Sequence, residues 1–299
     1  MTAVGLLGTG RMGSSMAHAL AAAGFEVVCW NRTPEPAAAL AAELGGRSMA
    51  SPAEVAQTAD VCVSMLADGT AVRAVYGGPD GLVAGARPGN VLVDSSTVPP
   101  TAIRQFEAAT RRAGAGILDA PVSGSVGLAR SGALTIMVGG EPADVELARP
   151  VLSAIASTIF HLGPLGTGAA MKLAVNTVIF GVNQALAEAL VLAEAAGIDR
   201  TAAYDVLAAS AVRSPYMDYK RAAFLEPESA PVAFALDLAA KDLRLITAFA
   251  NELGLAMPQT AANLAFIEAA SAGGRGDRDF SKVADHLREQ ARTEEDATA

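Results

Sequence analysis

The stretch Val4-Gly5-Leu6-Leu7-Gly8-Thr9-Gly10-Arg11-Met12-Gly13 decides the fold. A short apolar strand runs directly into a Gly-x-Gly-x-x-Gly pattern, and a helical pattern follows over residues 14–23. In this context the first glycine permits a tight turn, the second lets a pyrophosphate approach, and the third lets the helix pack closely. The anion then lies at a helix N-terminus. An ordinary glycine-rich turn is the alternative. The predicted dinucleotide-binding residues are Gly8, Thr9, Gly10, Arg11, Met12 and Gly13.

The second strand, residues 26–30, ends at Asn31-Arg32-Thr33. An acidic side chain at this place would bind the ribose 2′-hydroxyl of NAD, and none is present. Arg32 can instead pair with a 2′-phosphate, because its guanidinium is planar and always charged. We therefore expect Asn31, Arg32 and Thr33 to favour NADP (NADPH) over NAD.

Strands and helices continue to alternate up to residue 163. A Ser-Pro-x-Glu pattern at residues 51–54 starts a helix. The further strands expected are 60–66, 91–94, 116–119, 134–138 and 158–162, the last closing the sheet. Ligands lie beyond the carboxyl ends of strands in such sheets, so Met65, Leu66 and Thr97 should border the cofactor. An ordinary loop or helix-cap hydroxyl is the alternative role for Thr97.

A Gly/Ser-rich loop follows the strand at 116–119, at Ser123-Gly124-Ser125. Its backbone N–H groups and hydroxyls could bind an anion such as a carboxylate. Taken alone, it is also a plausible plain loop.

The stretch Gly166-Thr167-Gly168-Ala169-Ala170-Met171-Lys172-Leu173-Ala174-Val175-Asn176 marks a change, because helical patterns dominate after it. Lys172 and Asn176 are four residues apart and share one face of a long apolar helix. A lysine on this face either extends its amine to water along the apolar surface or performs a function. The sequence around it does not decide between the two.

The C-terminal half is expected to be all-helical, with a polar-aromatic loop at 213–219 and a turn at 273–279 before a final helix. Lys241-Asp242 alone would indicate a solvated helix face. The expected domains are a Rossmann domain (1–163), a helical substrate and oligomerisation domain (164–292) and a disordered acidic tail (293–299).

Composition limits the function. The net charge is -9 and the pI about 4.9, with no basic cluster, so nucleic acid and anionic membranes are not expected partners. The two cysteines lie in apolar runs, the three histidines are scattered, and no metal site is expected. We find neither a basic leader nor an uncharged apolar run of ~18 residues, and expect a cytoplasmic protein.

Five motifs in chain order together resemble the β-hydroxyacid dehydrogenase family, which includes 3-hydroxyisobutyrate dehydrogenase and glyoxylate/succinic semialdehyde reductase. They are the fingerprint at 5–13, Asp119–Gly124, Gly166–Asn176, Lys241–Leu243 and Asp277–Ser281. The resemblance implies an α/β Rossmann domain joined by a long helix to an all-α domain, and a homodimer or homotetramer formed through the helical domain. The chain departs from the family pattern at Ser125, where the usual loop has a second glycine.

The resemblance also implies roles for matching residues. Lys172 corresponds to the catalytic lysine, and Asn176 to the asparagine that helps hold substrate and lysine. Ser123 and Gly124 match the loop that binds the substrate carboxylate, which makes neighbouring Ser125 a further candidate. The remaining matches are Thr97 and Lys241, near nicotinamide and substrate, and Phe234 and Asp242, as pocket residues of semialdehyde-reducing members.

We therefore expect an NADP-dependent oxidoreductase acting on a small 3-hydroxy acid or semialdehyde, with Lys172 as general acid/base. Aldehyde reduction is the favoured direction. An imine reductase is one alternative, although such enzymes generally carry another residue in place of the lysine. A non-catalytic NADPH-binding protein would be expected to lose that lysine. The chain is much shorter than 6-phosphogluconate dehydrogenase, which it resembles in its first domain.

Overall fold

The computed structural model describes the backbone of residues 3–298, and the surroundings of residues 3–272 and 274–291. Contacts divide the chain into two units, Met1–Lys172 and Leu173–Ala299. The sequence places the boundary after residue 163, whereas the contacts assign the first turn of the long helix to the first unit. Each unit is described by itself.

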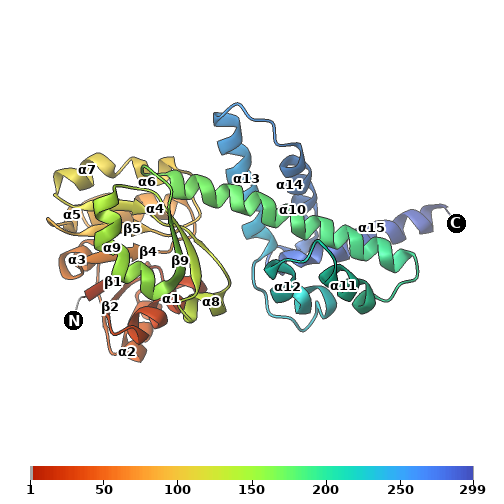
Figure 1. The fold of residues 1–299 in the computed structure, drawn as a ribbon, viewed down its shortest axis with the longest axis horizontal. Helices are drawn as coiled ribbons and strands as arrows, with labels where there is room; N and C mark the ends of the chain where they lie inside the picture. Colours follow the sequence, from red (N-terminus) through yellow and green to blue (C-terminus); the bar gives the residue numbers. More distant parts are fainter. Residues whose placement is uncertain (1–2, 299) are drawn as a thin grey trace. The chain divides into compact units, whose positions relative to one another are not determined.

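The first unit is a Rossmann-like α/β structure (Figure 1). Its strands are β1 (Ala3–Leu7), β2 (Glu26–Trp30), β3 (Arg47–Ser48), β4 (Val61–Ser64), β5 (Val91–Asp94), β6 (Gly116–Asp119), β7 (Val122–Ser123), β8 (Leu134–Val138) and β9 (Ala156–His161). Its helices are α1 (Arg11–Ala22), α2 (Pro34–Leu44), α3 (Pro52–Thr58), α4 (Gly69–Tyr76), α5 (Leu82–Gly85), α6 (Thr101–Arg104), α7 (Glu107–Arg112), α8 (Val126–Arg130) and α9 (Pro142–Ile155).

The main sheet has six parallel strands in the order β3-β2-β1-β4-β5-β6. The strand order reverses between β1 and β4, and open α/β sheets bind ligands at the carboxyl ends of such a pair. The fingerprint follows β1, so it lies at this switch point. The expectation that the strand near 158–162 closes this sheet is wrong, because β9 belongs to a separate sheet ordered β7-β8-β9. Strand periodicity does not reveal the pairing partner.

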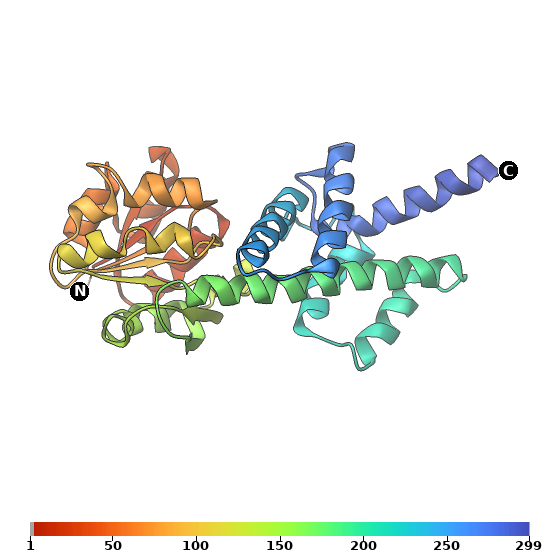
Figure 2. The same cartoon turned by 90° about the horizontal axis from the view of Figure 1, so that it is seen from above.

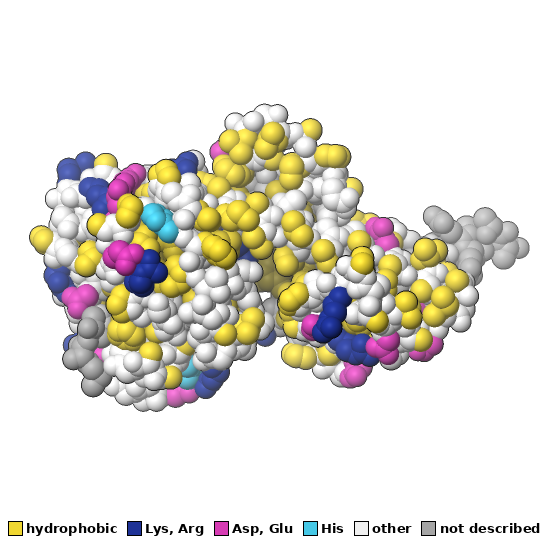
Figure 3. Space-filling view, viewed as in Figure 1, with side chains coloured by type: hydrophobic (Ala, Val, Ile, Leu, Met, Phe, Trp, Pro, Cys, Tyr) yellow, Lys and Arg dark blue, Asp and Glu magenta, His cyan; other side chains and the backbone are white. Residues whose placement is uncertain are grey.

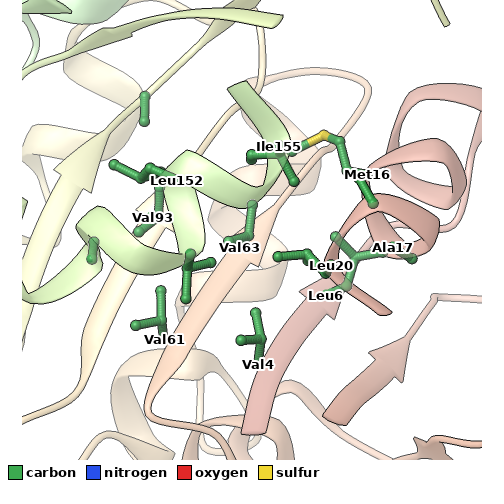
Figure 4. Close-up of a cluster of buried hydrophobic side chains, with 14 of the residues drawn as sticks. Val4, Leu6, Met16, Ala17, Leu20, Val61, Val63, Val93, Leu152 and Ile155 are labelled. Carbon is green, nitrogen blue, oxygen red and sulfur yellow. The ribbon is translucent and has the colours of Figure 1, made fainter. Parts of the chain in front are cut away.

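Alternate residues of a strand point to opposite sides of the sheet. Helices cover both faces of the main sheet, and each face has its own buried cluster. Val63 and Val93 belong to a buried cluster with Leu20 of α1 and Leu152 of α9 (Figure 4). Their neighbour Leu92 belongs to the cluster on the other side, which includes residues of α3, α4 and α6. A strand buried on both faces reads as a continuous apolar run, which explains why the sequence shows these strands clearly.

The second unit is all-helical. Its elements are most of α10 (Thr167–Ala195), α11 (Arg200–Ala209), α12 (Pro215–Leu225), α13 (Leu236–Glu252), α14 (Pro258–Ala270), a π-helical turn (Ser271–Arg275), a 3₁₀ turn (Phe280–Lys282) and α15 (Val283–Thr298). The acidic stretch 293–298, expected to be disordered, forms the end of α15, and Ala299 lies outside the described residues.

The expectation of a loop at 213–219 is wrong, because most of this segment forms the start of α12. Ser214 is the N-cap and Pro215 the first helical residue, a combination that favours helix initiation. Tyr216 is buried and donates a hydrogen bond to Asn183 Oδ1 at 2.7 Å. Tyr216 therefore packs into the helical core, whereas Tyr219 is 49% exposed.

A single unbroken helix, α10, leads from the first unit into the second (Figure 2). Among the described residues it is the one helix with the length and composition needed to cross a membrane, with a mean hydropathy of 1.4. Core helices meet the same criterion, and Asn176 and Asn183 of α10 make buried hydrogen bonds within the second unit. On the face shown in Figure 3, acidic and basic side chains are interspersed among apolar ones.

Candidate active site

The fingerprint loop has the geometry that its glycines predict. Gly8 has φ +98°, and a Cβ there would lie 2.3 Å from the carbonyl oxygen of Met65. A Cβ on Gly13 would lie 2.0 Å from the oxygen of Gly8. Gly10 differs, because a Cβ there would meet nothing within 4 Å. Two glycines are thus required by packing, while Gly10 faces open space that a ligand can enter.

This loop fits a bound pyrophosphate. Gly10 is the N-cap of α1 and provides no side-chain cap, and α1 has no acidic residue in its first turn. The Thr9 Oγ1 atom is buried and has no hydrogen-bond partner among the described residues. A buried hydroxyl without a partner costs about 1–3 kcal/mol, which a phosphate oxygen would relieve. Arg11, exposed in the first turn, and half-buried Met12 complete the loop.

The end of β2 is tied to the same loop. Asn31 Oδ1 accepts a hydrogen bond from the Thr9 amide at 3.3 Å, and Asn31 Nδ2 donates to Thr33 Oγ1 at 2.9 Å. Asn31 therefore holds the turn in place. The Arg32 side chain is exposed beside it, and no carboxylate occurs between residues 31 and 33. Arg32 is the cation that the turn presents at the carboxyl end of β2.

The segments after β4 and β5 are joined at the same edge of the sheet. The Leu66 amide donates to Ser96 Oγ at 2.9 Å, and Ser96 Oγ donates to Asp94 Oδ1 at 2.7 Å. Half-buried Thr97 follows directly. Helix α6 takes Pro100 as its N-cap residue, so Thr97 is not the cap of that helix. Burial raises the pKa of Asp94 to about 6, although hydrogen bonds from Ser96 and a second serine lower it.

Asp119, at the end of β6, fixes the beginning of the lysine-bearing helix. Its two carboxylate oxygens accept hydrogen bonds from the amides of Gly166 and Ala169, each at 2.6 Å. A Cβ on Gly168 would lie 2.2 Å from the oxygen of Met137, so only glycine allows this close approach. A carboxylate at a helix N-terminus is also favoured by the helix dipole.

Lys172 follows this clamp by about one turn of α10 and is half-buried. Burial raises the pKa of Asp119, and its hydrogen bonds from Gly166 and Ala169 act in the opposite direction. Because Asp119 of β6 binds the start of α10, this strand sets the position of the Lys172 backbone. The same strand leads into the Gly/Ser segment.

The Gly/Ser segment is less loop-like than its composition suggests. Ser123 belongs to the short strand β7, which pairs with Thr135 of β8. Gly124 has φ +140° and is exposed. Ser125 Oγ accepts the Leu128 amide at 3.3 Å and caps the short helix α8. The Ser125 hydroxyl proton remains available to a ligand, because its oxygen acts as the acceptor in this bond.

In the second unit, three predicted residues form one polar group. Asn176 Nδ2 donates to Asp242 Oδ2 at 2.9 Å, and Lys241 Nζ lies 3.0 Å from Asp242 Oδ1. Asp242 is buried, so the solvated face suggested by spacing alone is wrong for this residue. The carboxylate therefore accepts a hydrogen bond from the Asn176 amide and forms an ion pair with the Lys241 ammonium.

Phe234 lies just before α13 and is half-buried. Its ring contacts those of Phe180 and Phe280, with centroids 6.2 and 5.6 Å away. Its amide donates to Asp279 Oδ2 at 3.2 Å. Asp279 also binds the buried ammonium of Lys220 at 2.6 Å, so an internal ion pair holds the Phe234 backbone.

Sequence reasoning missed Asp94, Ser96 and Asp119 as contributors to the site. Asp119 opens one of the five motifs, and Asp94 is the last residue of a predicted strand. An acidic residue at the carboxyl end of a buried strand needs partners, so the positions of Asp94 and Asp119 indicate a structural or functional role. The partners themselves lie up to 50 residues away in sequence and could not be read from it.

Comparisons with known proteins agree with this geometry. Residues 3–163 match the family model described as the NAD binding domain of 6-phosphogluconate dehydrogenase. Residues 166–287 match the model described as NAD-binding of NADP-dependent 3-hydroxyisobutyrate dehydrogenase. Each half of the chain therefore corresponds to a recognised dehydrogenase domain.

Individual relatives cover nearly the whole chain. Glyoxylate/succinic semialdehyde reductase 2 of Arabidopsis thaliana is 34% identical over 95% of this chain and 79% of its own. The structure of Mycobacterium tuberculosis 3-hydroxyisobutyrate dehydrogenase with L-serine is 34% identical, with a TM-score of 0.85, over 96% of this chain and 99% of that one. A structure of Psf3 in complex with NADP+ and 2-OPP is 26% identical, with a TM-score of 0.86, over 95% and 99%.

The Rossmann-like unit and its helical partner define a nicotinamide-dependent oxidoreductase that acts on CH–OH groups. More specifically, the chain belongs to the β-hydroxyacid dehydrogenase family, as the five motifs predict. It is an NAD(P)-dependent hydroxyacid dehydrogenase or semialdehyde reductase.

Proposed function

We propose that the chain uses NADP(H) to interconvert a small 3-hydroxy acid and its semialdehyde, with Lys172 as the general acid/base. The observation that carries this proposal is the clamp of Asp119 on the start of α10, about one turn before Lys172. A catalytic group needs a fixed backbone, and here two short hydrogen bonds fix it.

A bound nicotinamide supplies or accepts the hydride. In the reductive direction, the Lys172 ammonium donates a proton to the oxygen that gains negative charge, and its positive charge stabilises that oxygen. In the oxidative direction, the neutral amine removes the hydroxyl proton. We favour reduction, because an ordinary lysine, with a pKa of ~10.4, is already protonated at neutral pH.

The substrate carboxylate is assigned to the segment Ser123–Ser125. Ser123 and Ser125 supply hydroxyl protons, and exposed Gly124 leaves its backbone open to a ligand. In the second unit, Asp242 keeps the Asn176 amide and the Lys241 ammonium oriented, and we propose that these two groups also serve the substrate and cofactor.

Replacing Lys172 by alanine tests the mechanism. We expect kcat to fall by about 10²–10⁴-fold, the usual contribution of general acid/base catalysis, while the Kd for NADPH changes little. Met171→Ala is the matched control, because Met171 is its exposed neighbour and has no assigned role. Substrates should include glyoxylate, succinic semialdehyde, 3-hydroxyisobutyrate and L-serine. A Lys172→Ala enzyme with wild-type kcat on the best of these would refute the assignment.

The preference for NADP is assigned to Arg32. A charge-assisted hydrogen bond contributes about 1.5–3 kcal/mol, so Arg32→Asp should weaken NADPH binding by about 10–100-fold. The same change should improve binding of NADH, because a carboxylate can accept the ribose hydroxyls. Equal kcat/KM values with NADPH and NADH in the wild type, or an unchanged ratio in Arg32→Asp, would contradict this assignment.

A further inference from the structure

Ser96 joins the ends of β4 and β5 by two hydrogen bonds. The Leu66 amide donates to Ser96 Oγ at 2.9 Å, and the Ser96 hydroxyl donates to Asp94 Oδ1 at 2.7 Å. Ser96 and Asp94 are each only 1% exposed. Hydrogen bonds between buried groups are costly to break, because water does not replace the lost partner.

The acceptor oxygen on Asp94 is fixed from a second side. Ser64 Oγ donates to the same Oδ1 atom at 2.7 Å, and the Tyr76 hydroxyl lies 3.0 Å from Ser64 Oγ. The one proton of Ser64 is used on Asp94, so Tyr76 is the donor in the second contact. Ser64 Oγ also lies 3.4 Å from the carbonyl oxygen of Val93, a longer contact than the one to Asp94. The Ser96 hydroxyl accepts from Leu66 and donates to Asp94, so it has one orientation.

The bond from Leu66 acts on the fingerprint through one peptide unit. The Met65–Leu66 peptide is planar and trans, so the Met65 carbonyl points opposite to the Leu66 N–H. That carbonyl lies against Gly8, where a Cβ would come within 2.3 Å of its oxygen. With Ser96 holding one end of the peptide, the other end meets the first glycine of the fingerprint.

We propose that Ser96, oriented by Asp94, is a positioning residue for the dinucleotide. It fixes the Met65–Leu66 peptide, and this peptide sets how closely the β4 segment approaches Gly8 at the switch point of the sheet. Ser96 contributes to nucleotide affinity without touching the nucleotide. The inference rests on the proposed assignment of Met65, Leu66 and Thr97 to the cofactor.

The neighbouring residue provides a matched control. Ser95 has the same side chain and is also 1% exposed. Its Oγ atom has no hydrogen-bond partner among the residues that the structure describes. Removing this hydroxyl makes the same chemical change one residue away, but it breaks no link to the fingerprint.

The experiment compares Ser96→Ala with Ser95→Ala in the full chain, by NADPH titration, steady-state kinetics and thermal unfolding. Ser96→Ala should raise the NADPH Kd about tenfold, the change that one net hydrogen bond of about 1.4 kcal/mol produces. The KM for NADPH should rise with it, while kcat at saturating cofactor stays near wild type. Ser95→Ala should keep the wild-type Kd.

A merely structural role would lower the Tm of Ser96→Ala and leave its Kd equal to that of Ser95→Ala, and this result would overturn the inference. If Ser96→Ala does not fold, Ser96→Cys replaces it, because a thiol of similar size is a weaker acceptor. An unchanged Kd in Ser96→Cys would then overturn the inference. Because the readout is nucleotide binding, it is separate from the turnover of Lys172→Ala.

Discussion

The buried carboxyl of Asp94 should make the first unit less stable as the pH rises, and Asp94→Asn should remove this dependence. Burial raises the pKa of Asp94 from 3.8 to about 6. The nearby carboxylate of Asp119 raises it further, whereas Ser64 and Ser96 lower it by hydrogen bonding. The folded state therefore keeps this proton up to a higher pH than the unfolded state does.

The sign follows from proton linkage. The protonated Asp94 carboxyl contributes to the free energy of unfolding. This contribution is fully present below about pH 4 and is lost as the pH rises through about 6. A pKa difference of about two corresponds to about 3 kcal/mol over the whole range. Asparagine resembles the protonated acid, since it keeps the oxygen that accepts from Ser64 and Ser96 and does not ionise.

The assay is urea unfolding between pH 4 and 8 at low protein concentration, followed by the fluorescence of Trp30, the one tryptophan of the chain. Trp30 ends β2 and reports on the first unit. From pH 4 to pH 7 the wild type should lose about 2–3 kcal/mol relative to Asp94→Asn. Asp80→Asn, at an exposed position, is the control for removing one carboxyl from the surface of the first unit. A constant difference between Asp94→Asn and the wild type would refute the reasoning.

Two further predictions concern stability, one through packing and one through a buried ion pair. Gly168→Ala places a methyl group 2.2 Å from the Met137 oxygen and should lower the free energy of unfolding by about 1–3 kcal/mol. Gly181→Ala on the same helix meets nothing within 4 Å and should raise it by about 0.5–1 kcal/mol. Equal unfolding midpoints for the two variants in circular dichroism would contradict this. Lys220→Met leaves the buried carboxylate of Asp279 without its ion-pair partner and should cost about 3–5 kcal/mol. A double-mutant cycle with Asp279→Asn should give a coupling of roughly 0.5–3 kcal/mol, and additive effects would show that the pair is not coupled.

The Rossmann-like unit could be predicted because its signals are local. The fingerprint, the apolar strands and the start of α3 at Ser51 each occupy a few consecutive residues. The pairing of β9 could not be predicted, since it depends on a parallel neighbour more than 20 residues earlier. The start of α12 carries a recognised initiation signal, Ser214-Pro215, but the polar and aromatic composition of 213–219 is also typical of a loop.

The site divides in the same way. The structure shows Asn176, Lys241 and Asp242 in contact, a grouping that spacing could not provide, because Asn176 and Asp242 are 66 residues apart. Lysine next to aspartate is usually solvated, and only the packing of α13 shows that Asp242 is buried. The family resemblance, and not the spacing, predicts these residues.

The glycines of the motifs indicate the fold of this chain, whereas residues without a packing role indicate what it binds. Gly8, Gly13 and Gly168 each face a carbonyl oxygen that a Cβ would approach within 2.3 Å. Packing alone therefore requires these three glycines, whatever the chain binds, and a motif match at them identifies the fold rather than the reaction. Gly10 and the Thr9 hydroxyl have no such explanation, because one faces open space and the other lacks a partner among the described residues. Function is better argued from features that the folded chain leaves unused, and at the fingerprint these two point to a phosphate.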